Sequence, residues 1–173
     1  MLRLALLAPV AVVAAGLSDR PSIVFNTSIG DVRLGMTRNA VVGAYGAGTT
    51  VRFRHYFPVG VKYHGKVLVR TTYRIHRGKL IVSYVDGRVK MVETTSRNYR
   101  TASGVGVGTR IPRGPCHLDQ VGGCQYRWRS FTYDDCGRAW LGGMRRLTTV
   151  LYVRRSRVYR VQLGEDDVVL YCF

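Results

Sequence analysis

Acidic residues are scarce in this chain, in which 10 Asp and Glu residues stand against 27 Lys and Arg residues. The acids form no pair typical of carboxylate catalysis. The sequence also lacks an HExxH zinc motif and a nucleophile elbow around serine or cysteine. The densest acidic run, Glu165-Asp166-Asp167, supplies too few ligands for calcium. We therefore expect a protein that is not an enzyme and that uses no cofactor.

Long apolar runs are missing as well. The main one, residues 4–15 (LALLAPVAVVAA), is short of the roughly 20 residues that a membrane-spanning helix needs. Because Arg3 precedes it and small residues end it, the pattern predicts a signal peptide over residues 1–15 and a secreted protein. No cysteine follows the predicted cleavage point, so a lipoprotein is not expected. Residues 16–28 are expected to form a loose N-terminal arm.

Lysine is rare too, so arginine supplies 23 of the 27 basic side chains and most of the formal net charge of +17. Guanidinium groups pair with carboxylates and phosphates in a forked geometry that an ammonium group cannot match. The excess of arginine therefore favours anionic partners. A GC-rich genome, whose codons favour arginine, explains the excess at least as well.

Cysteine is absent from the first half of the chain. All four cysteines come later, at Cys116, Cys124, Cys136 and Cys172. An even number of cysteines in a secreted chain predicts two disulfides. Their spacing does not match the ligand pairs of zinc fingers, so a structural metal site is not expected.

The rest of the sequence predicts mostly short strands joined by tight turns. Residues 79–96 (KLIVSYVDGRVKMVETTS) predict a hairpin, because Asp86-Gly87 tolerates positive φ and β-branched residues flank it. In its second strand we expect Val89 and Met91 on one side, opposite Lys90 and Val92.

The rest of the first half extends this hairpin into an antiparallel meander. Strands are expected at residues 51–57 and 66–75, before the hairpin. A short helix is expected ahead of them, with Thr37 as its N-cap and Gly46 at its end.

The hairpin returns in imperfect form near the C-terminus. Residues 152–161 (YVRRSRVYRV) match residues 84–92 (YVDGRVKMV) with one more residue in the turn. Earlier in the chain, residues 104–109 (GVGVGT) echo residues 32–37 (VRLGMT), with Gly108 in the place of Gly35. Two matches in the same order indicate an internal duplication.

The predicted fold is therefore α+β, with two tandem repeats that each pack a short helix or turn on an antiparallel β-meander. Repeat 1 spans residues 29–100 and repeat 2, which carries the cysteines, spans residues 101–173. A second sheet is expected to use four strands, with a loop at residues 134–143. These strands are predicted at residues 125–133, 147–153, 157–163 and 168–172.

Two stretches resemble known bacterial families. Residues 30–46 (GDVRLGMTRNAVVGAYG) are similar to the opening of the SmpA/OmlA-like and beta-lactamase-inhibitory-protein-like families. These families place a short helix on an antiparallel sheet, and the inhibitory protein has this unit in tandem. Residues 85–109 (VDGRVKMVETTSRNYRTASGVGVGT) resemble uncharacterised secreted proteins of high-GC bacteria. Together the resemblance covers about residues 29–163 and implies an architecture rather than an activity.

The same resemblance implies a disulfide pairing, Cys116 with Cys136, which leaves Cys124 for Cys172. The nearest-neighbour pairing, Cys116–Cys124 with Cys136–Cys172, stays open. The chain departs from the families in two respects. It lacks the lipoprotein cysteine of the SmpA/OmlA-like proteins, and no contact residue of an inhibitor can be matched to it.

Arginine alternates with aromatic residues in several predicted strands. In residues 125–133 (QYRWRSFTY), two arginines and Phe131 are expected to share one face. Such a cationic, partly aromatic surface suits polyanions. The alternative is a solvated strand face whose charge only prevents edge-to-edge aggregation. The residues expected to bind anions are Arg52, Arg54, Arg127, Arg129, Arg154 and Arg157.

Two functions follow from these patterns. The first is a secreted, non-enzymatic binding module that associates with an anionic envelope polymer or with a protein, and with nucleic acid only through non-specific charge. The second is a secreted inhibitor of an enzyme, similar to beta-lactamase inhibitory protein, which would hold one partner tightly through a few aromatic side chains. No small-molecule substrate is inferred.

Overall fold

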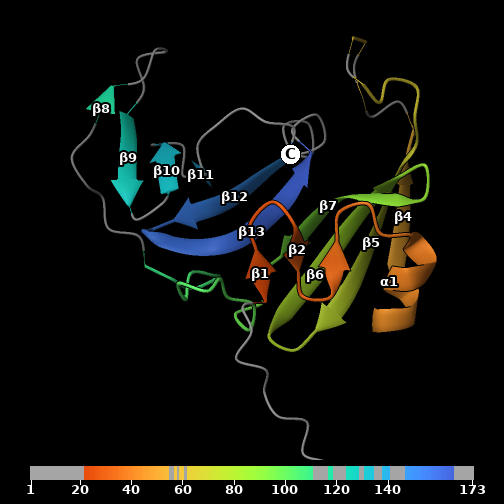
Figure 1. Ribbon diagram of the computed structural model, residues 1–173, viewed down its shortest axis with the longest axis horizontal. Helices are drawn as coiled ribbons and strands as arrows, with labels where there is room; N and C mark the ends of the chain where they lie inside the picture. The colour runs from red at the N-terminus through yellow and green to blue at the C-terminus, as the bar shows by residue number, and fades with distance from the viewer. Residues whose placement is uncertain are drawn as a thin grey trace, which may run out of the picture.

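The computed structural model describes residues 22–54, 57, 59–60, 62–110, 117–118, 124–128, 131–134, 138–140 and 147–165, with the backbone alone for residues 117–148 (Figure 1). The described elements are β1 (Ile23–Val24), β2 (Ser28–Ile29), β3 (Val32–Arg33), α1 (Arg38–Tyr45), β4 (Thr49–Phe53), β5 (Leu68–Ile75), β6 (Gly78–Val85), β7 (Arg88–Thr94), β8 (His117–Leu118), β9 (Cys124–Trp128), β10 (Phe131–Asp134), β11 (Arg138–Trp140), β12 (Leu147–Arg154) and β13 (Arg157–Glu165). The fold is thus mostly antiparallel β-sheet with one short helix. At this coarse level the expected fold class is confirmed.

Ten of the described strands form one continuous sheet, in the order β4-β5-β6-β7-β13-β12-β11-β10-β9-β8. The expectation of a separate second sheet was wrong. The strands from the two halves of the chain meet where β13 pairs with β7, with Leu163 opposite Val92 and Val161 opposite Thr94. This contact is between residues far apart in sequence, and no local pattern marks it.

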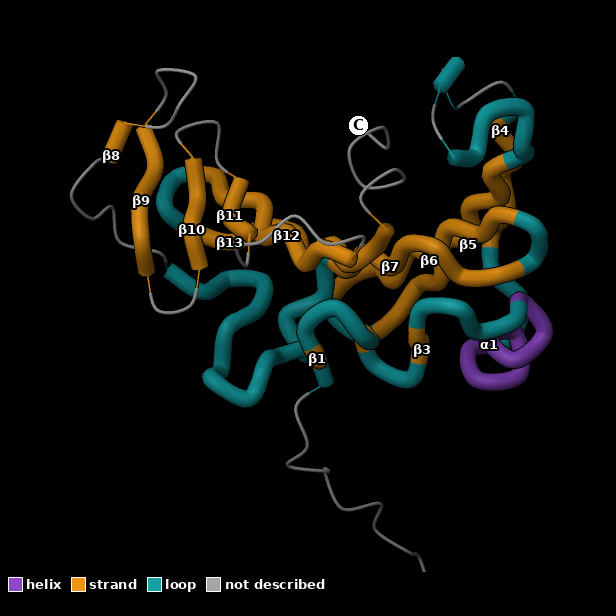
Figure 2. Tube along the Cα trace, turned by 45° about the horizontal axis from the view of Figure 1, so that its top comes forward, coloured by secondary structure: helices purple, strands orange, loops and turns teal. Residues whose placement is uncertain are grey.

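One face of this sheet, which we call the covered face, lies under α1 and the small sheet β1-β2-β3 (Figure 2). Ile29 and Val41 from the covering elements pack with Val82 and Leu163 in the main hydrophobic core. Ile23 is also buried in this core, at 2% exposure. The described part of the predicted arm is therefore packed against the sheet and is not loose.

Local sequence signals set the bounds of α1. The side chain of Thr37 accepts a hydrogen bond from the Ala40 amide at 3.3 Å, as an N-cap does. Gly46 ends the helix with a φ of 73°, a conformation that favours glycine. Both expectations are confirmed. Val41 is the buried residue of the helix, so its packing on the sheet rests mainly on one side chain.

The predicted hairpin is confirmed as β6 and β7, and a second hairpin of the same kind joins β12 to β13. Asp86 and Gly87 both have positive φ, at 51° and 71°. Arg155 and Ser156 do the same, at 50° and 57°. Such two-residue turns match the twist of the strands they join. Because both turns have two residues, the extra turn residue predicted for the second hairpin is not found.

A β-bulge overturns the prediction that Val89 and Met91 share a side. Ser83 pairs with Met91, but Tyr84 pairs with Val89, so Lys90 is an extra residue in β7. The alternation shifts at that point. Val89 packs in the main core, whereas Met91 packs in a second cluster.

The second hairpin contains the same bulge. Tyr152 pairs with Arg160 and Val153 pairs with Val158, so Tyr159 is the extra residue in β13. Lys90 and Tyr159 therefore hold the same position relative to their turns.

The segment before α1 hydrogen-bonds to the first hairpin. The Gly35 amide donates to the Val89 carbonyl at 2.8 Å, and the Val89 amide donates to the Met36 carbonyl at 2.9 Å. The guanidinium of Arg88 donates to the Gly35 carbonyl at 3.1 Å.

An equivalent set of bonds ties residues 108–110 to the second hairpin. The Gly108 amide donates to the Val158 carbonyl at 2.7 Å, and the Val158 amide donates to the Thr109 carbonyl at 2.9 Å. Arg157 donates to the Gly108 carbonyl at 3.2 Å, as Arg88 does to Gly35. Residues 35 and 108, which the sequence paired, thus make the same contacts.

The remaining corrections concern residues 117–148. The single strand expected at residues 125–133 is a hairpin of β9 and β10, in which Trp128 pairs with Phe131. The alternation along one strand, on which the shared face of two arginines and Phe131 was predicted, therefore does not run through residues 125–133. The loop expected at residues 134–143 contains β11, which pairs with β12. The strand expected at residues 168–172 and the predicted signal peptide lie outside the described residues.

Candidate functional site

The face of the ten-stranded sheet opposite the covered face, which we call the second face, carries a smaller core. Met91, Val85 and Tyr152 pack there with Phe57 and Tyr63 from the connection between β4 and β5. Consecutive residues of a strand point to opposite faces. Tyr84 accordingly lies in the main core and its neighbour Val85 lies in this one.

Polar side chains cross the second face beside this core. We call them the polar band, and they are Arg70, Ser83, Glu93, Arg160 and Gln162. They come from the adjacent strands β5, β6, β7 and β13. The register places Arg70 opposite Ser83 and Glu93 opposite Gln162.

An ion pair lies at the centre of the polar band. Arg160 Nη1 is 3.5 Å from Glu93 Oε2, and the two side chains are 22% and 9% exposed. The Arg160 guanidinium lies 3.7 Å from the centre of the Tyr152 ring. The Arg70 guanidinium lies 5.4 Å from the centre of the Phe53 ring. Aromatic faces thus hold both cations in place.

Burial disfavours the ionised form of Glu93. Burial raises its pKa, and the attraction of Arg160 and Arg70 offsets that rise only in part. Buried ion pairs often add no net stability, because desolvation cancels their attraction.

Several atoms of the polar band are buried without a hydrogen-bond partner in the described part of the chain. They are Arg70 Nε, Ser83 Oγ, Arg160 Nε and Gln162 Oε1. Ser83 and Gln162 are completely buried. A buried polar atom without a partner costs about 1–3 kcal/mol. These unpartnered atoms therefore oppose the stability of the fold.

A second ionic cluster, which we call the Glu165 clamp, lies on the end of β13. Glu165 accepts hydrogen bonds from Lys90 Nζ at 2.7 Å, from Lys62 Nζ at 3.1 Å and from the Tyr63 hydroxyl. Burial alone would raise the pKa of Glu165, but the bonds from Lys90, Tyr63 and Lys62 outweigh it and lower the pKa. The clamp ties the β4–β5 connection to β7 and β13.

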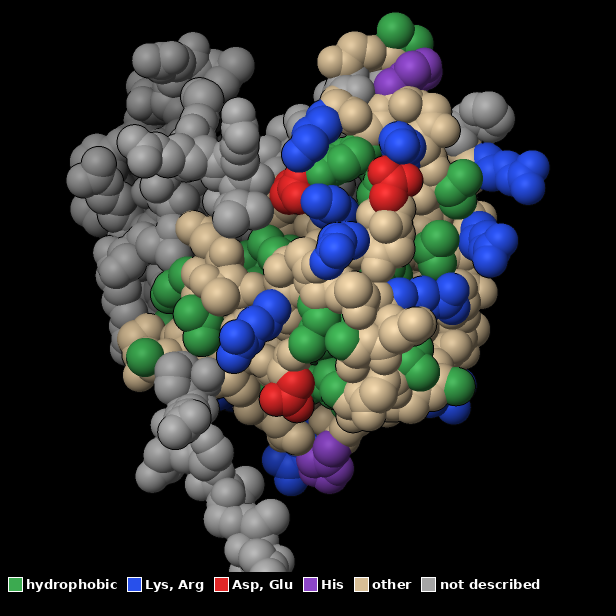
Figure 3. Space-filling model, turned by 45° about the vertical axis from the view of Figure 1, so that its right-hand side comes forward, with side chains coloured by type: hydrophobic (Ala, Val, Ile, Leu, Met, Phe, Trp, Pro, Cys, Tyr) green, Lys and Arg blue, Asp and Glu red, His purple; other side chains and the backbone are tan. Residues whose placement is uncertain are grey.

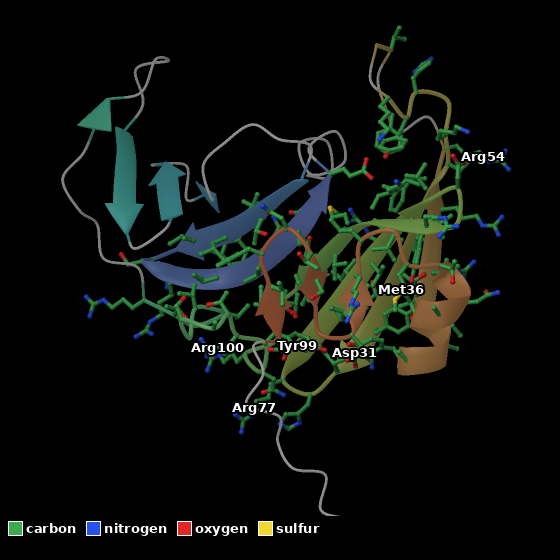
Figure 4. All side chains as sticks on the ribbon, in the orientation of Figure 1. Asp31, Met36, Arg54, Arg77, Tyr99 and Arg100 are labelled. Atoms are coloured by element: carbon green, nitrogen blue, oxygen red, sulfur yellow. The ribbon has the colours of Figure 1, made fainter. Side chains whose placement is uncertain are left out.

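The arginines predicted to bind anions do not form one site. Arg52 lies on the edge strand β4, while Arg154 and Arg157 flank the turn between β12 and β13. In the order of the sheet, β13 is four strand spacings from β4 and β12 is five, which puts the two groups about 19–24 Å apart at ~4.8 Å per spacing. Arg54 lies beyond the end of β4, far from Arg77 and Arg100 (Figure 4). On the face seen in Figure 3, the Lys and Arg side chains are spread out and outnumber the acidic side chains.

Two of the predicted residues lie where side chains are not described. Arg127 is placed by its backbone in β9, and Arg129 lies outside the described residues. Cys116, Cys136 and Cys172 also lie outside them, and Cys124 is placed by its backbone alone. Both disulfide pairings therefore stay predictions.

Arg52 lines an open hollow of about 400 Å³ beside the first hairpin turn. Lys66, Val69 and Asp86 also line it. Lys66 Nζ and Asp86 Oδ2 are 3.1 Å apart and both side chains are exposed. Their charges cancel, so Arg52 supplies the net charge of the hollow.

The described part of the chain contains no group of three or more His, Cys, Asp and Glu side chains that could hold a metal ion. None of its helices is long and apolar enough to cross a membrane.

The polar band was not predicted from the sequence. One signal was present, because Glu93 and Gln162 interrupt strands that are otherwise rich in apolar residues. A buried polar residue is more informative than an exposed apolar one.

Comparison with known proteins shows a similarity of fold alone. No protein-family model matches the sequence, and no curated protein shows significant similarity to it. Among solved structures, an extracellular protein containing a SCP domain from Bacillus anthracis is similar, with a TM-score of 0.52 and 8% identity, covering 80% of this chain and 46% of that chain. A cysteine-rich secretory protein from Staphylococcus aureus has a TM-score of 0.48 and 13% identity, covering 79% of this chain and 44% of that chain.

The chain thus spans less than half the length of either of these two proteins. The Bacillus anthracis protein is described neither as a beta-lactamase inhibitory protein nor as SmpA/OmlA-like, so the resemblance stated from residues 30–46 stays a prediction. The fold is shared with an extracellular bacterial protein that contains a SCP domain.

Proposed function

We propose that this chain is a secreted, non-enzymatic binding module that associates with an anionic polymer of the cell envelope. The proposal rests on one observation, that acidic side chains are paired with basic ones while several exposed arginines are not. Asp86, Glu93 and Glu165 each form an ion pair with a lysine or arginine. Exposed arginines on β4 and at the β12–β13 turn have no acidic partner among the described residues. The unmatched charge is therefore cationic and faces solvent.

Secretion is supported by two observations. Residues 1–15 have the pattern of a signal peptide. The similar fold from Bacillus anthracis belongs to a protein described as extracellular. A secreted cationic protein meets anionic envelope polymers before other polyanions.

We also infer that the chain arose by duplication, with repeats over residues 29–100 and 101–173. The shared turn length, the matching bulges at Lys90 and Tyr159, and the matching bonds of Gly35 and Gly108 support this inference. Arg88 and Arg157 hold equivalent positions and both are exposed. Duplication would present the same cationic hairpin twice to a long polymer.

The test is binding to polyphosphate, a simple polyanion, over a range of salt concentrations. Each neutralised charge releases counterions, so affinity should fall steeply between low and moderate salt. Replacing Arg52 and Arg54, or Arg154 and Arg157, with Gln should weaken binding at low salt. The melting temperature should stay nearly unchanged, because exposed charges contribute little to stability.

The matched control removes two other exposed charges, with Lys66→Gln and Arg97→Gln. Lys66 is already paired with Asp86, so its loss should matter less. An equal loss of affinity in this control would mean that net charge alone drives binding and that there is no site.

A further inference from the structure

The open hollow beside the first hairpin turn is large enough for a small ligand. Its volume of about 400 Å³ lies within the roughly 300–1,000 Å³ that is usual for small-ligand sites. Two glycines line it, Gly65 and Gly87. A Cβ added at either glycine would meet no atom within 4 Å, so both border open space. The lining groups of the hollow are therefore accessible to a ligand from solvent.

One wall of the hollow carries a guanidinium group that the fold does not use. Arg52 is exposed and has neither an ion-pair partner nor a hydrogen-bond partner among the described residues. It lies opposite Val69 in the pairing of β4 with β5, and Val69 lines the hollow as well. Residues that lie opposite each other in a sheet share a face. A free cation thus stands beside apolar surface, and a guanidinium can hold a carboxylate through two parallel N–H groups.

The exposed ion pair of Lys66 and Asp86 also lines the hollow. Their charged atoms are 3.1 Å apart, and the two side chains are 51% and 64% exposed. Such an exposed pair contributes little to stability, so a ligand can compete for both partners. Asp86 can accept from an N–H group, and Lys66 can donate to a carbonyl. Two cations and one anion leave one net positive charge in the hollow, which suits a ligand with a single negative charge.

Hydrogen bonds within the protein hold the walls of the hollow in place. The Lys66 amide donates to the Tyr63 carbonyl at 2.9 Å, which fixes the turn that carries Gly65. The Gly87 carbonyl accepts from the Arg38 amide at 3.0 Å, which fixes the hairpin turn on the other wall. A ligand would not have to order these segments, and this lowers the entropic cost of binding.

We propose that this hollow binds the C-terminal carboxylate of a peptide whose last side chain is small and apolar. The carboxylate lies on Arg52, and the last side chain packs on Val67 and Val69. The backbone amide groups before it bond to the pair of Lys66 and Asp86. Val67 is 40% exposed and so offers apolar surface to the ligand. Because the hollow is open, the rest of the peptide continues into solvent. This inference goes beyond the proposed function, which concerns polymers with many charges.

The test is calorimetric titration of the full chain, at constant ionic strength, with N-acetyl-glycyl-alanyl-valine as the free acid. The same peptide with a C-terminal amide lacks the charge and should bind about tenfold more weakly or worse. N-acetylvaline keeps the carboxylate but has fewer amide groups, so it should also bind more weakly. Saturable binding of the free acid in the millimolar range or tighter, in this order of affinity, supports the proposal.

Three results of this titration would count against the proposal. Failure of the free acid to bind overturns it. Equal affinity of the amidated peptide overturns the carboxylate site. Equal affinity of N-acetylvaline overturns the assignment to the end of a peptide.

Arg52→Gln should weaken binding of the free acid about tenfold or more, because it removes the charged donor. The matched control is Arg74→Gln, which removes an exposed charge from the neighbouring strand β5 and does not line the hollow. The control should leave the affinity for the peptide unchanged. Equal affinities of the two variants would overturn the proposal.

Val67→Ser keeps every charge and removes apolar surface from the hollow. It should weaken peptide binding about threefold or more, because the contact with the last side chain is lost. Polyphosphate binding should not change in this variant, and unchanged peptide affinity would overturn the proposal. Polyphosphate binding by the wild type without peptide binding would overturn this inference alone. Peptide binding without polyphosphate binding would overturn the proposed polymer binding alone.

Discussion

At the scale of single residues, Glu93 is a buried carboxyl whose charged form is disfavoured by burial. Burial raises its pKa above the ordinary value of a glutamate, despite the attraction of Arg160 and Arg70. A carboxyl whose pKa is higher in the folded than in the unfolded state binds its proton more tightly when folded. Its contribution to stability is therefore favourable at low pH and is lost as pH rises through the folded pKa.

Glu93→Gln should accordingly leave the melting temperature at neutral pH unchanged or raise it by about 2–4 °C, the equivalent of ~1 kcal/mol in a chain of this size. Glutamine keeps the shape and an acceptor for Arg160, which is still partly solvated. Melting curves between weakly acidic and neutral pH should lose the part of their pH dependence that comes from Glu93. Asp86→Asn, at an exposed pair, is the control and should change little. A fall of several degrees in Glu93→Gln would show that the ion pair is net stabilising.

At the scale of elements, the Glu165 clamp holds the long β4–β5 connection on the second face. The hydrogen bonds from Lys90, Tyr63 and Lys62 lower the pKa of Glu165 although burial opposes them. Because the pKa of Glu165 is lower in the folded state, its ionised form contributes to the stability of the folded protein at every pH above the pKa of a glutamate in the unfolded chain. That contribution is lost as pH falls through the folded value.

Low pH should loosen residues 62–66 in the wild type, because it protonates Glu165. Glu165→Gln should therefore loosen the same residues at neutral pH. Hydrogen exchange followed by mass spectrometry should show faster exchange in this connection and little change in β6. Lys66→Gln removes only the exposed pair with Asp86 and serves as the control. Unchanged protection of residues 62–66 in Glu165→Gln would argue that the apolar contacts of Phe57 and Tyr63 hold the connection alone.

The elements that the sequence predicted well are those whose signals are local. Asp86-Gly87 requires positive φ at two successive residues, and Thr37 and Gly46 mark the two ends of a helix, so each could be placed from a few neighbours. The bulge at Lys90 could not, because it depends on how β6 and β7 are aligned. The hairpin of β9 and β10 was missed because no Gly or Pro lies between Trp128 and Phe131.

The polar band could not be predicted for a related reason. Its residues are spread from position 70 to position 162, and only the pairing of β7 with β13 brings Glu93 beside Gln162. Strand alternation from the sequence put the arginines of β4 and of the second hairpin on exposed positions. It could not show that four or five strand spacings keep the two groups of arginines apart.

At the scale of the whole molecule, the two halves share one core. Val82 and Val92 from the first half and Leu151, Val161 and Leu163 from the second belong to the same buried cluster. The β7–β13 pairing also makes the hydrogen-bonded sheet continuous across the junction. Separate folding of the two halves would expose the apolar surface that each provides to the other.

We therefore expect one cooperative unfolding transition, which a single substitution at the junction shifts as a whole. Leu163 is completely buried and lies opposite Val92, so Leu163→Ala should cost about 2–5 kcal/mol through the lost contacts and the cavity. Calorimetry should still show one transition at a lower temperature, and amides of β6 should lose protection together with those of β12. Val51→Ala, at a half-exposed position on the edge strand β4, is the control and should shift the transition far less. A shared core would pass the destabilisation by Leu163→Ala to both halves. Two resolved transitions, or a loss of protection confined to β12 and β13, would therefore contradict this prediction and mean that the halves are joined only by the pairing of their edge strands.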